Sequence, residues 1–136
     1  MSKLSAVTAR IGETPYVVTL SDSEGHQWLS DEPPAAGGGG RGPTPHQLLL
    51  ASLGACTAMT LRMYALRKGW PLPAVEVELQ FNPGGPPPAG GSDIRRRISL
   101  RGELSAEQRA RLLEIANACP LHKVLTGEVR ITTSLT

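Results

Sequence analysis

The sequence predicts an α+β fold in which antiparallel sheets surround one long apolar helix. Two features of the chain support this prediction. Three strand-like segments precede a helical segment at residues 45–68, and further strands and helices follow it without the regular alternation that a parallel sheet requires. A length of 136 residues suits one domain, so we expect a single domain over residues 1–136.

The first thirty residues have the pattern of a strand meander. Alternating or β-branched segments separated by turn signals predict three strands, at about residues 7–11, 16–20 and 26–29. Residues 31–45 then contain four prolines and five glycines. This composition predicts a long loop of the kind that is functional or mobile.

Residues 45–68 have the pattern of a helix. Thr44 fits the N-cap and Pro45 the first turn, while Gly69 and a nearby proline end the helix. Over residues 48–61 the helix is apolar on nearly every face, so it must be buried on all sides. One chain of this size covers one face and leaves the rest, which predicts a partner subunit and most simply a two-fold homodimer.

The second half of the chain predicts a hairpin followed by helices. Ser105 and Gln108 form a capping box, which begins a helix. The expected elements are, in order, strands at 75–81 and 94–101, a helix from 105 to about 118, a short helix at 120–126 and a last strand at 129–133.

Composition excludes several classes of function. Fourteen basic and twelve acidic residues give a net charge of +2, and aromatic residues are few, so nucleic-acid binding is not expected. The apolar stretch at 48–61 is too short to span a bilayer, and the first residues lack a signal peptide's apolar run. We therefore expect a cytoplasmic protein without a membrane partner. The two cysteines and three histidines lack the spacing of a zinc site, so no metal or cofactor is expected.

Residues 37–42 match the dinucleotide-binding pattern G-x-G-x-x-G, but their context argues against that function. No buried strand precedes them, and no acidic residue follows at the distance that a ribose contact requires. We interpret this segment as a loop.

The arginine run at residues 95–97 lies on a predicted strand, so its members alternate between two faces. Arg96 shares the face of the apolar residues, and the other two arginines lie on the opposite face. Glu76 and Glu78 are available to pair across the hairpin. We therefore interpret the run as solvated and cross-paired rather than as a binding patch.

Cys56 lies in the middle of the apolar helix, where a lone cysteine is usually a small core residue. A reactive thiolate there needs a cation from another element, because Arg62, the nearest basic residue of the helix, lies on the opposite face. Arg10, in the first predicted strand, and Arg41, in the glycine-rich loop, are the candidates.

Cys119 precedes Pro120 and therefore lies near the N-cap of the short helix. Backbone N–H groups and the helix dipole favour a thiolate at that position. Two cysteines on two helices permit a dithiol–disulfide couple, and the sequence alone leaves open whether they come within bonding range.

Two segments resemble the OsmC/Ohr family, most closely its OsmC-like branch. They are GPTPHQLLLASLGACTAMTLRMYALRKGWPL at residues 42–72 and CPLHKVLTGEV at residues 119–129. The resemblance extends over about residues 4–135. It implies an intertwined homodimer in which two long central helices are sandwiched between sheets built from both subunits.

The resemblance also implies thiol-dependent reduction of organic hydroperoxides, with no metal or haem. By position, Cys56 matches the peroxidatic cysteine and Cys119 the resolving one, whose disulfide an external dithiol reduces. The family's activating arginine best matches Arg10, with Arg41 as the alternative. Where family members usually carry an acidic residue after the first proline of the helix, this chain has His46 and Gln47. Gln47 can hydrogen-bond to an arginine but cannot neutralise it.

Two other functions are consistent with the sequence. The same dimer, with Leu49, Met59 and Met63 lining a cleft, could hold a small apolar molecule without turnover. A redox-sensing or regulatory protein would use the same cysteines but turn over slowly.

Overall fold

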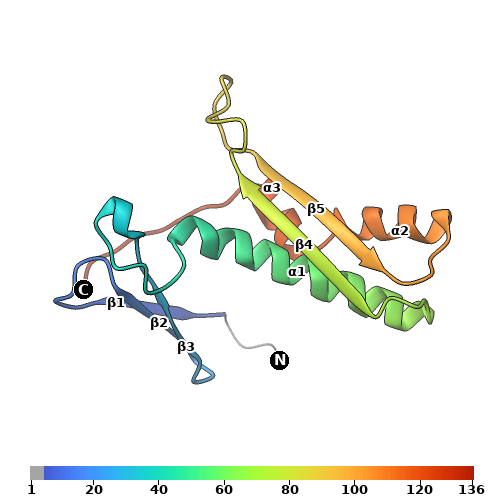
Figure 1. The fold of residues 1–136 in the computed structure, drawn as a ribbon. Coiled ribbons are helices and arrows are strands. Elements are labelled where there is room, and N and C mark those ends of the chain that lie inside the picture. The colour runs from blue at the N-terminus through green and yellow to red at the C-terminus, as the bar shows by residue number, and fades with distance from the viewer. Residues whose placement is uncertain (1–4) are drawn as a thin grey trace. The chain divides into compact units, whose positions relative to one another are not determined.

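The structure is a computed structural model that describes residues 5–136, and it has the predicted α+β architecture (Figure 1). Its described elements are, in order, β1 (Val7–Ile11), β2 (Val18–Asp22), β3 (Gln27–Ser30), the 3₁₀ helix η1 (Pro34–Ala36), α1 (Pro45–Lys68), β4 (Ala74–Phe81), β5 (Ile94–Arg101), α2 (Ala106–Ala116) and α3 (Pro120–Thr126). The chain forms two compact units, one ending at Leu49 and the other spanning Leu50–Thr136.

The first unit contains a three-stranded antiparallel sheet in the order β1–β2–β3, so the three predicted strands are confirmed. The second strand begins at Val18 rather than at Tyr16. Tyr16 has a φ of 68°, a left-handed conformation that turns the chain instead of continuing a strand. Arg10 of β1 lies opposite Thr19 of β2 and is exposed.

The glycine-rich loop before α1 is held by the buried carboxylate of Asp31. Its oxygens accept hydrogen bonds from the backbone N–H groups of Glu32, Gly39 and Arg41, at 2.7, 3.2 and 3.0 Å. These bonds, that of Arg41 foremost, lower the pKa of Asp31 although burial opposes the shift. At Gly38 a Cβ atom would collide with the Glu32 carbonyl, so this position requires glycine. The loop is therefore a hydrogen-bonded structure despite its composition.

α1 begins and ends where the sequence predicts. The Thr44 N–H donates to Gln47 Oε1 at 2.9 Å, and the Gln47 N–H donates to Thr44 Oγ1 at 3.2 Å. This reciprocal pair satisfies two N–H groups that the first turn leaves without partners. At the other end, Gly69 has a φ of 72°, a conformation that glycine adopts without strain.

α1 is buried along one side only within the described chain. Its buried residues recur every four positions: Leu53, Thr57, Leu61 and Ala65. Large apolar side chains on its other faces are exposed: Leu49, Met59, Met63 and Leu66. By length and composition alone, this helix of 24 residues could cross a membrane. This is weak evidence, because core helices of soluble proteins meet the same criterion.

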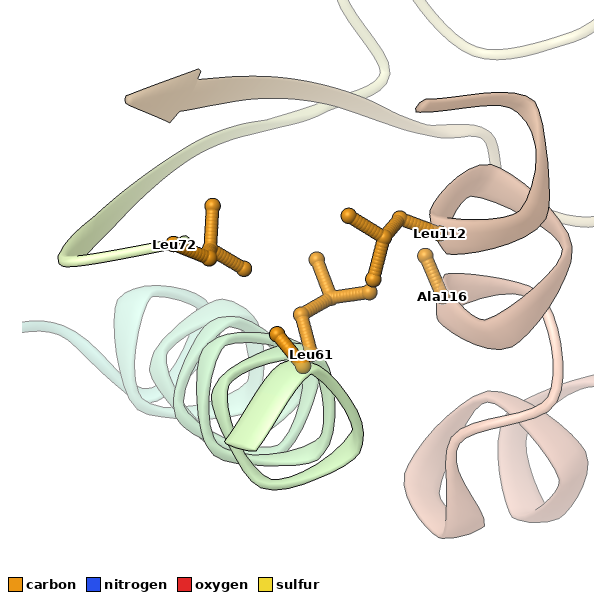
Figure 2. Close-up of a cluster of buried hydrophobic side chains, with 5 residues drawn as sticks. Leu61, Leu72, Leu112 and Ala116 are labelled. Carbon is orange, nitrogen blue, oxygen red and sulfur yellow. The ribbon is translucent and has the colours of Figure 1, made fainter. Parts of the chain in front are cut away.

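The second unit is built on the antiparallel hairpin of β4 and β5. Val75 of β4 lies opposite Leu100 of β5, and both side chains, with that of Ile98, pack against the hydrophobic core. Figure 2 shows Leu61 of α1 pointing toward Leu112 and Ala116 of α2. The buried cluster consists of Leu61, Ala65, Leu72, Leu112 and Ala116.

The C-terminal helices agree with the prediction, and the last strand does not. The capping box of α2 is present: the Gln108 N–H donates to Ser105 Oγ at 3.1 Å, and the Ser105 N–H donates to Gln108 Oε1 at 2.9 Å. The predicted strand at 129–133 is wrong for the described chain, because neither sheet includes it and Ile131 is 86% exposed. An alternating sequence forms a strand only where another strand offers an edge to pair with.

Candidate dithiol site

The structure brings the two cysteines together within the second unit. Cys56 lies on α1 and is partly exposed, whereas Cys119 is the N-cap of α3 and has no exposed surface. Both are free thiols, and the side chain of Cys56 acts as a hydrogen-bonding neighbour of the Cys119 thiol. The two thiols are therefore neighbours.

Local sequence explains where Cys119 lies. α2 ends at Ala116 with Asn117 as its C-cap, and the Cys119 N–H donates to the Ala116 carbonyl in a tight turn. Pro120 fixes the first position of α3, so Cys119 takes the extended N-cap conformation. Its Sγ then accepts a hydrogen bond from the His122 N–H at 3.4 Å. The predicted N-cap position is confirmed.

Arg96, half-buried on β5, joins three elements around the thiols. Its Nη1 donates to Thr57 Oγ1 at 2.9 Å, and its Nη2 donates to Asn117 Oδ1 at 3.0 Å and to His122 Nδ1 at 2.9 Å. Because a guanidinium can only donate, His122 Nδ1 is the acceptor of this hydrogen bond. Among residues 5–136, no carboxylate forms an ion pair with Arg96.

The prediction that the whole arginine run is solvated is therefore wrong at Arg96. Its neighbours behave as predicted in part: Arg97 pairs across the hairpin with Glu78 at 4.0 Å. Glu76 lies opposite Ser99 and not opposite an arginine. The period of two residues places Arg96 on the inner face with the apolar side chains.

Thr57 connects Arg96 to Cys119. Besides accepting the Arg96 hydrogen bond, its Oγ1 lies 2.7 Å from the Leu53 carbonyl oxygen, to which it donates, and 3.8 Å from Cys119 Sγ. Thr57 is fully buried, and its hydroxyl has these protein atoms as partners in place of water. A hydroxyl in this position can exchange a hydrogen bond with the sulfur.

The surroundings of Cys119 favour its thiolate. Burial raises the pKa of the Cys119 thiol. The His122 N–H, the side chains of Thr57 and Cys56, and the positive charge of Arg96 act in the opposite direction and leave the pKa below the ordinary value of 9.0. Cys119 thus combines a lowered thiol pKa with complete burial.

A cavity of about 370 Å³ adjoins this cluster. Arg96, Asn117 and His122 supply polar atoms to its wall. Its apolar wall consists of Leu53, Ile94, Ile98, Leu113 and Leu125. No group of three or more His, Cys, Asp or Glu in the described part of the chain could hold a metal ion.

The other predicted site residues belong to the first unit. Arg10 is on β1, and Arg41 is in the glycine-rich loop, where its backbone N–H binds Asp31. Gln47 caps α1 through Thr44. Arg96 was not predicted as a site residue, although its place on the apolar face of the strand indicates that it points inward.

The family model for OsmC-like proteins matches residues 37–134. No curated protein matches the chain in sequence.

Solved structures share the fold over most of the chain. An OsmC-like protein from Mycoplasma pneumoniae is 21% identical, with a TM-score of 0.75, covering 93% of this chain and 90% of that one. An organic hydroperoxide resistance protein OsmC from Legionella pneumophila is 20% identical, with a TM-score of 0.66 and coverage of 92% and 90%. An organic hydroperoxide resistance protein from Elizabethkingia anophelis, with thiocyanate bound, is 18% identical, with a TM-score of 0.67 and coverage of 93% and 91%.

Proposed function

The chain belongs to the OsmC-like protein family, and on this premise we propose that it is a thiol-dependent reductase of organic hydroperoxides. In this proposal Cys56 is oxidised to a sulfenic acid, Cys119 resolves it as a disulfide, and an external dithiol restores both thiols. The observation that carries the proposal is the pair itself: two free cysteines, close enough for the Cys56 side chain to lower the pKa of Cys119, beside Arg96. Two relatives with the same fold are named organic hydroperoxide resistance proteins.

Exposure supports the order of the two cysteines. Cys56 has accessible surface and can meet a hydroperoxide, whereas Cys119 has none and can react only with a neighbouring group. A buried thiol that touches the accessible one is suited to close a disulfide with it. The roles proposed are therefore peroxidatic for Cys56 and resolving for Cys119.

The proposed chemistry balances without a metal or cofactor. The Cys56 thiolate attacks the outer oxygen of the hydroperoxide, so an S–O bond forms, the O–O bond breaks and the alkoxide leaves as an alcohol after taking up a proton. The Cys119 sulfur then attacks the Cys56 sulfur, which forms the disulfide and releases water. Two thiol–disulfide exchanges with an external dithiol return both cysteines to thiols and leave the reductant as a disulfide.

Activation of Cys56 requires a cation, and we propose Arg10, or alternatively Arg41, for this role. Both residues are exposed in the first unit, and each supplies a guanidinium cation. Gln47 Oε1, which accepts one hydrogen bond from Thr44, has a second lone pair for an arginine. Replacing each arginine by glutamine should identify the activating one as the variant whose Cys56 is oxidised at least tenfold more slowly.

We propose that the working form is an intertwined homodimer. The support is the uncovered apolar side of α1, where Met59 and Leu66 are each 67% exposed, and the unpaired alternating segment at 129–133. A second copy of the chain would bury the apolar side of α1 and could supply a strand that pairs with the segment at 129–133. Sedimentation velocity should give a dimer at micromolar concentration, shifted toward monomer by Leu66→Glu and unchanged by the exposed-strand control Gln80→Glu. A monomeric wild type would contradict this proposal.

Peroxide consumption tests the function directly. With cumene hydroperoxide and a dithiol, the wild type should turn over many times, Cys56→Ser should show only the uncatalysed rate, and Cys119→Ser should stop after one turnover as a sulfenic acid. Hydrogen peroxide serves as the control substrate and should be consumed more slowly. A wild type no faster than Cys56→Ser would refute the enzymatic proposal.

A second function, binding of a small apolar molecule without turnover, is favoured by one observation. A groove of about 590 Å³ beside α1 is lined mainly by apolar side chains, among them Met59, Met63, Leu66 and Val75. A fluorescent apolar probe should bind this groove if the alternative holds. Binding of the probe by a wild type that fails the peroxide assay would favour this alternative.

A further inference from the structure

Arg96 is a half-buried cation, and none of its hydrogen-bond partners is a carboxylate. Thr57, Asn117 and His122 accept its hydrogen bonds, but none of them carries a negative charge in this arrangement. The other arginines in described ion pairs face carboxylates, as Arg97 does Glu78. Moving a cation out of water without an opposite charge nearby costs free energy, so an anion near Arg96 would be stabilised.

The Cys119 thiol is the group in this cluster that can become that anion. Arg96 Nη1 lies 2.9 Å from Thr57 Oγ1, which in turn lies 3.8 Å from Cys119 Sγ. The other ionisable groups around the sulfur are Cys56, another thiol, and His122, an imidazole that supplies no negative charge. A thiolate at Cys119 would therefore give Arg96 its counter-charge one hydroxyl away.

The single proton of the Thr57 hydroxyl makes this connection specific. One lone pair of Oγ1 accepts from Arg96 in either state. With a Cys119 thiol, the hydroxyl donates to the Leu53 carbonyl and the S–H can donate to the other lone pair. With a thiolate, the hydroxyl can turn to donate to the sulfur, and the Leu53 carbonyl keeps the backbone hydrogen bond of the helix.

We propose that Arg96, acting through the Thr57 hydroxyl, holds Cys119 as a thiolate ready to attack oxidised Cys56. This makes Arg96 a positioning residue for disulfide formation, and the inference rests on the proposed function. The thiolate attacks the sulfur of the Cys56 sulfenic acid: the S–S bond forms, the S–O bond breaks, and the hydroxide takes a proton from solvent. When the dithiol attacks Cys56 in the disulfide, Cys119 leaves as the same stabilised thiolate.

A titration of Cys119 tests the inference apart from any peroxidase activity. In a Cys56→Ser background, thiolate absorbance near 240 nm should report Cys119 alone as the pH is raised. Arg96→Met and Thr57→Val should each lower the ratio of thiolate to thiol at a given pH by about tenfold, which corresponds to a pKa rise of about one unit. Thr57→Ser retains the hydroxyl and should recover most of the thiolate.

Arg97→Met is the matched control, because it removes the same charge from the exposed face of the same strand, where Arg97 is 76% exposed. It should leave the titration within about twofold of the parent. Identical titrations of the Arg96→Met, Thr57→Val and Arg97→Met variants would overturn the inference, even if the protein reduces peroxides. Circular dichroism confirms folding, and the nearly isosteric Thr57→Val provides the test if Arg96→Met fails to fold.

Rapid-mixing kinetics test the step itself. With one equivalent of cumene hydroperoxide, Arg96→Met should slow disulfide formation by about tenfold, so the Cys56 sulfenic acid accumulates and can be trapped by a dione reagent. The preceding oxidation of Cys56 should change much less. Equal slowing of both steps, or an unchanged rate of disulfide formation, would contradict a role at Cys119. Failure of the protein to consume peroxide refutes the proposed function, while the titration still decides whether Arg96 holds the thiolate.

Discussion

Arg96 and Arg97 are adjacent on β5, yet their surroundings are opposite. Arg97 lies on the outer face, 76% exposed, with Glu78 at 4.0 Å as a loosely held partner. Arg96 lies on the inner face, half-buried, and its hydrogen bonds connect α1, the end of α2 and α3. Side chains alternate between the two faces of the strand, so water screens the charge of Arg97 much more than that of Arg96. Identical side chains therefore differ in their electrostatic effect on their neighbours.

The largest difference in the free energy of unfolding should come from the core beneath the inner face of β5. Leu112→Ala removes a fully buried side chain and should lower the free energy of unfolding by about 2–5 kcal/mol. The adjacent control, Leu113→Ala, removes the same atoms from a residue that is 59% exposed and should cost less than about 1 kcal/mol. Urea denaturation measures both, and equal losses would show that the inner face is not packed as described.

Exchanging the two arginines for methionine compares the faces directly. Arg96→Met leaves Thr57, Asn117 and His122 without their donor and should cost about 1–3 kcal/mol of stability. Arg97→Met should cost less than about 0.5 kcal/mol. Thermal and urea unfolding provide the measurements, and a destabilisation by Arg97→Met as large as that by Arg96→Met would refute the contrast.

The pH dependence of stability sharpens the comparison further. The pKa of Cys119 is lowered in the folded state, so between that value and the unfolded value near 9.0 the unfolded chain binds more protons. Stability should therefore gain a contribution as pH rises through this window and lose it as pH falls through the folded pKa. Urea unfolding under reducing conditions should show this rise in the wild type and in Arg97→Met. The rise should be reduced in Arg96→Met and absent in Cys119→Ser.

The smallest effect should come from the outer ion pair. Glu78→Gln removes the partner of Arg97, but both side chains are largely exposed, so the loss should stay below about 0.5 kcal/mol and disappear in high salt. Unfolding measured at low and at high salt checks this. A larger loss that persists in high salt would mean that the outer pair is screened less than its exposure indicates.

Local patterns were sufficient to predict most of the fold. Alternation identified β4 and β5, and the Ser105 capping box and Gly69 marked helix ends that the structure confirms. These signals involve residues that are close together in the chain, so they can be recognised without knowing the tertiary structure. The strand expected at 129–133 failed because pairing requires an edge elsewhere, and a local pattern does not specify which edge is available.

The site was predicted less completely, for a related reason. Cys56 and Cys119 stood out by residue type, and the N-cap position of Cys119 followed from the proline after it. Arg96 and Thr57 belong to different elements, and their contact depends on how α1 packs against the hairpin. Until that packing is known, the sequence does not distinguish Arg96 from a solvated arginine, or Thr57 from an ordinary helix residue.

The hydroxyl of Thr57 has a single hydrogen, and two acceptors lie within its reach: the Leu53 carbonyl and the Cys119 sulfur. When the hydroxyl donates its hydrogen bond to the sulfur, the Leu53 carbonyl loses that hydrogen bond. The carbonyl stretching frequency of Leu53, isolated by ¹³C labelling, should therefore shift upward as the thiol ionises. A backbone vibration in the middle of α1 would then serve as a spectroscopic gauge of charge on a sulfur that no solvent-borne reagent can reach.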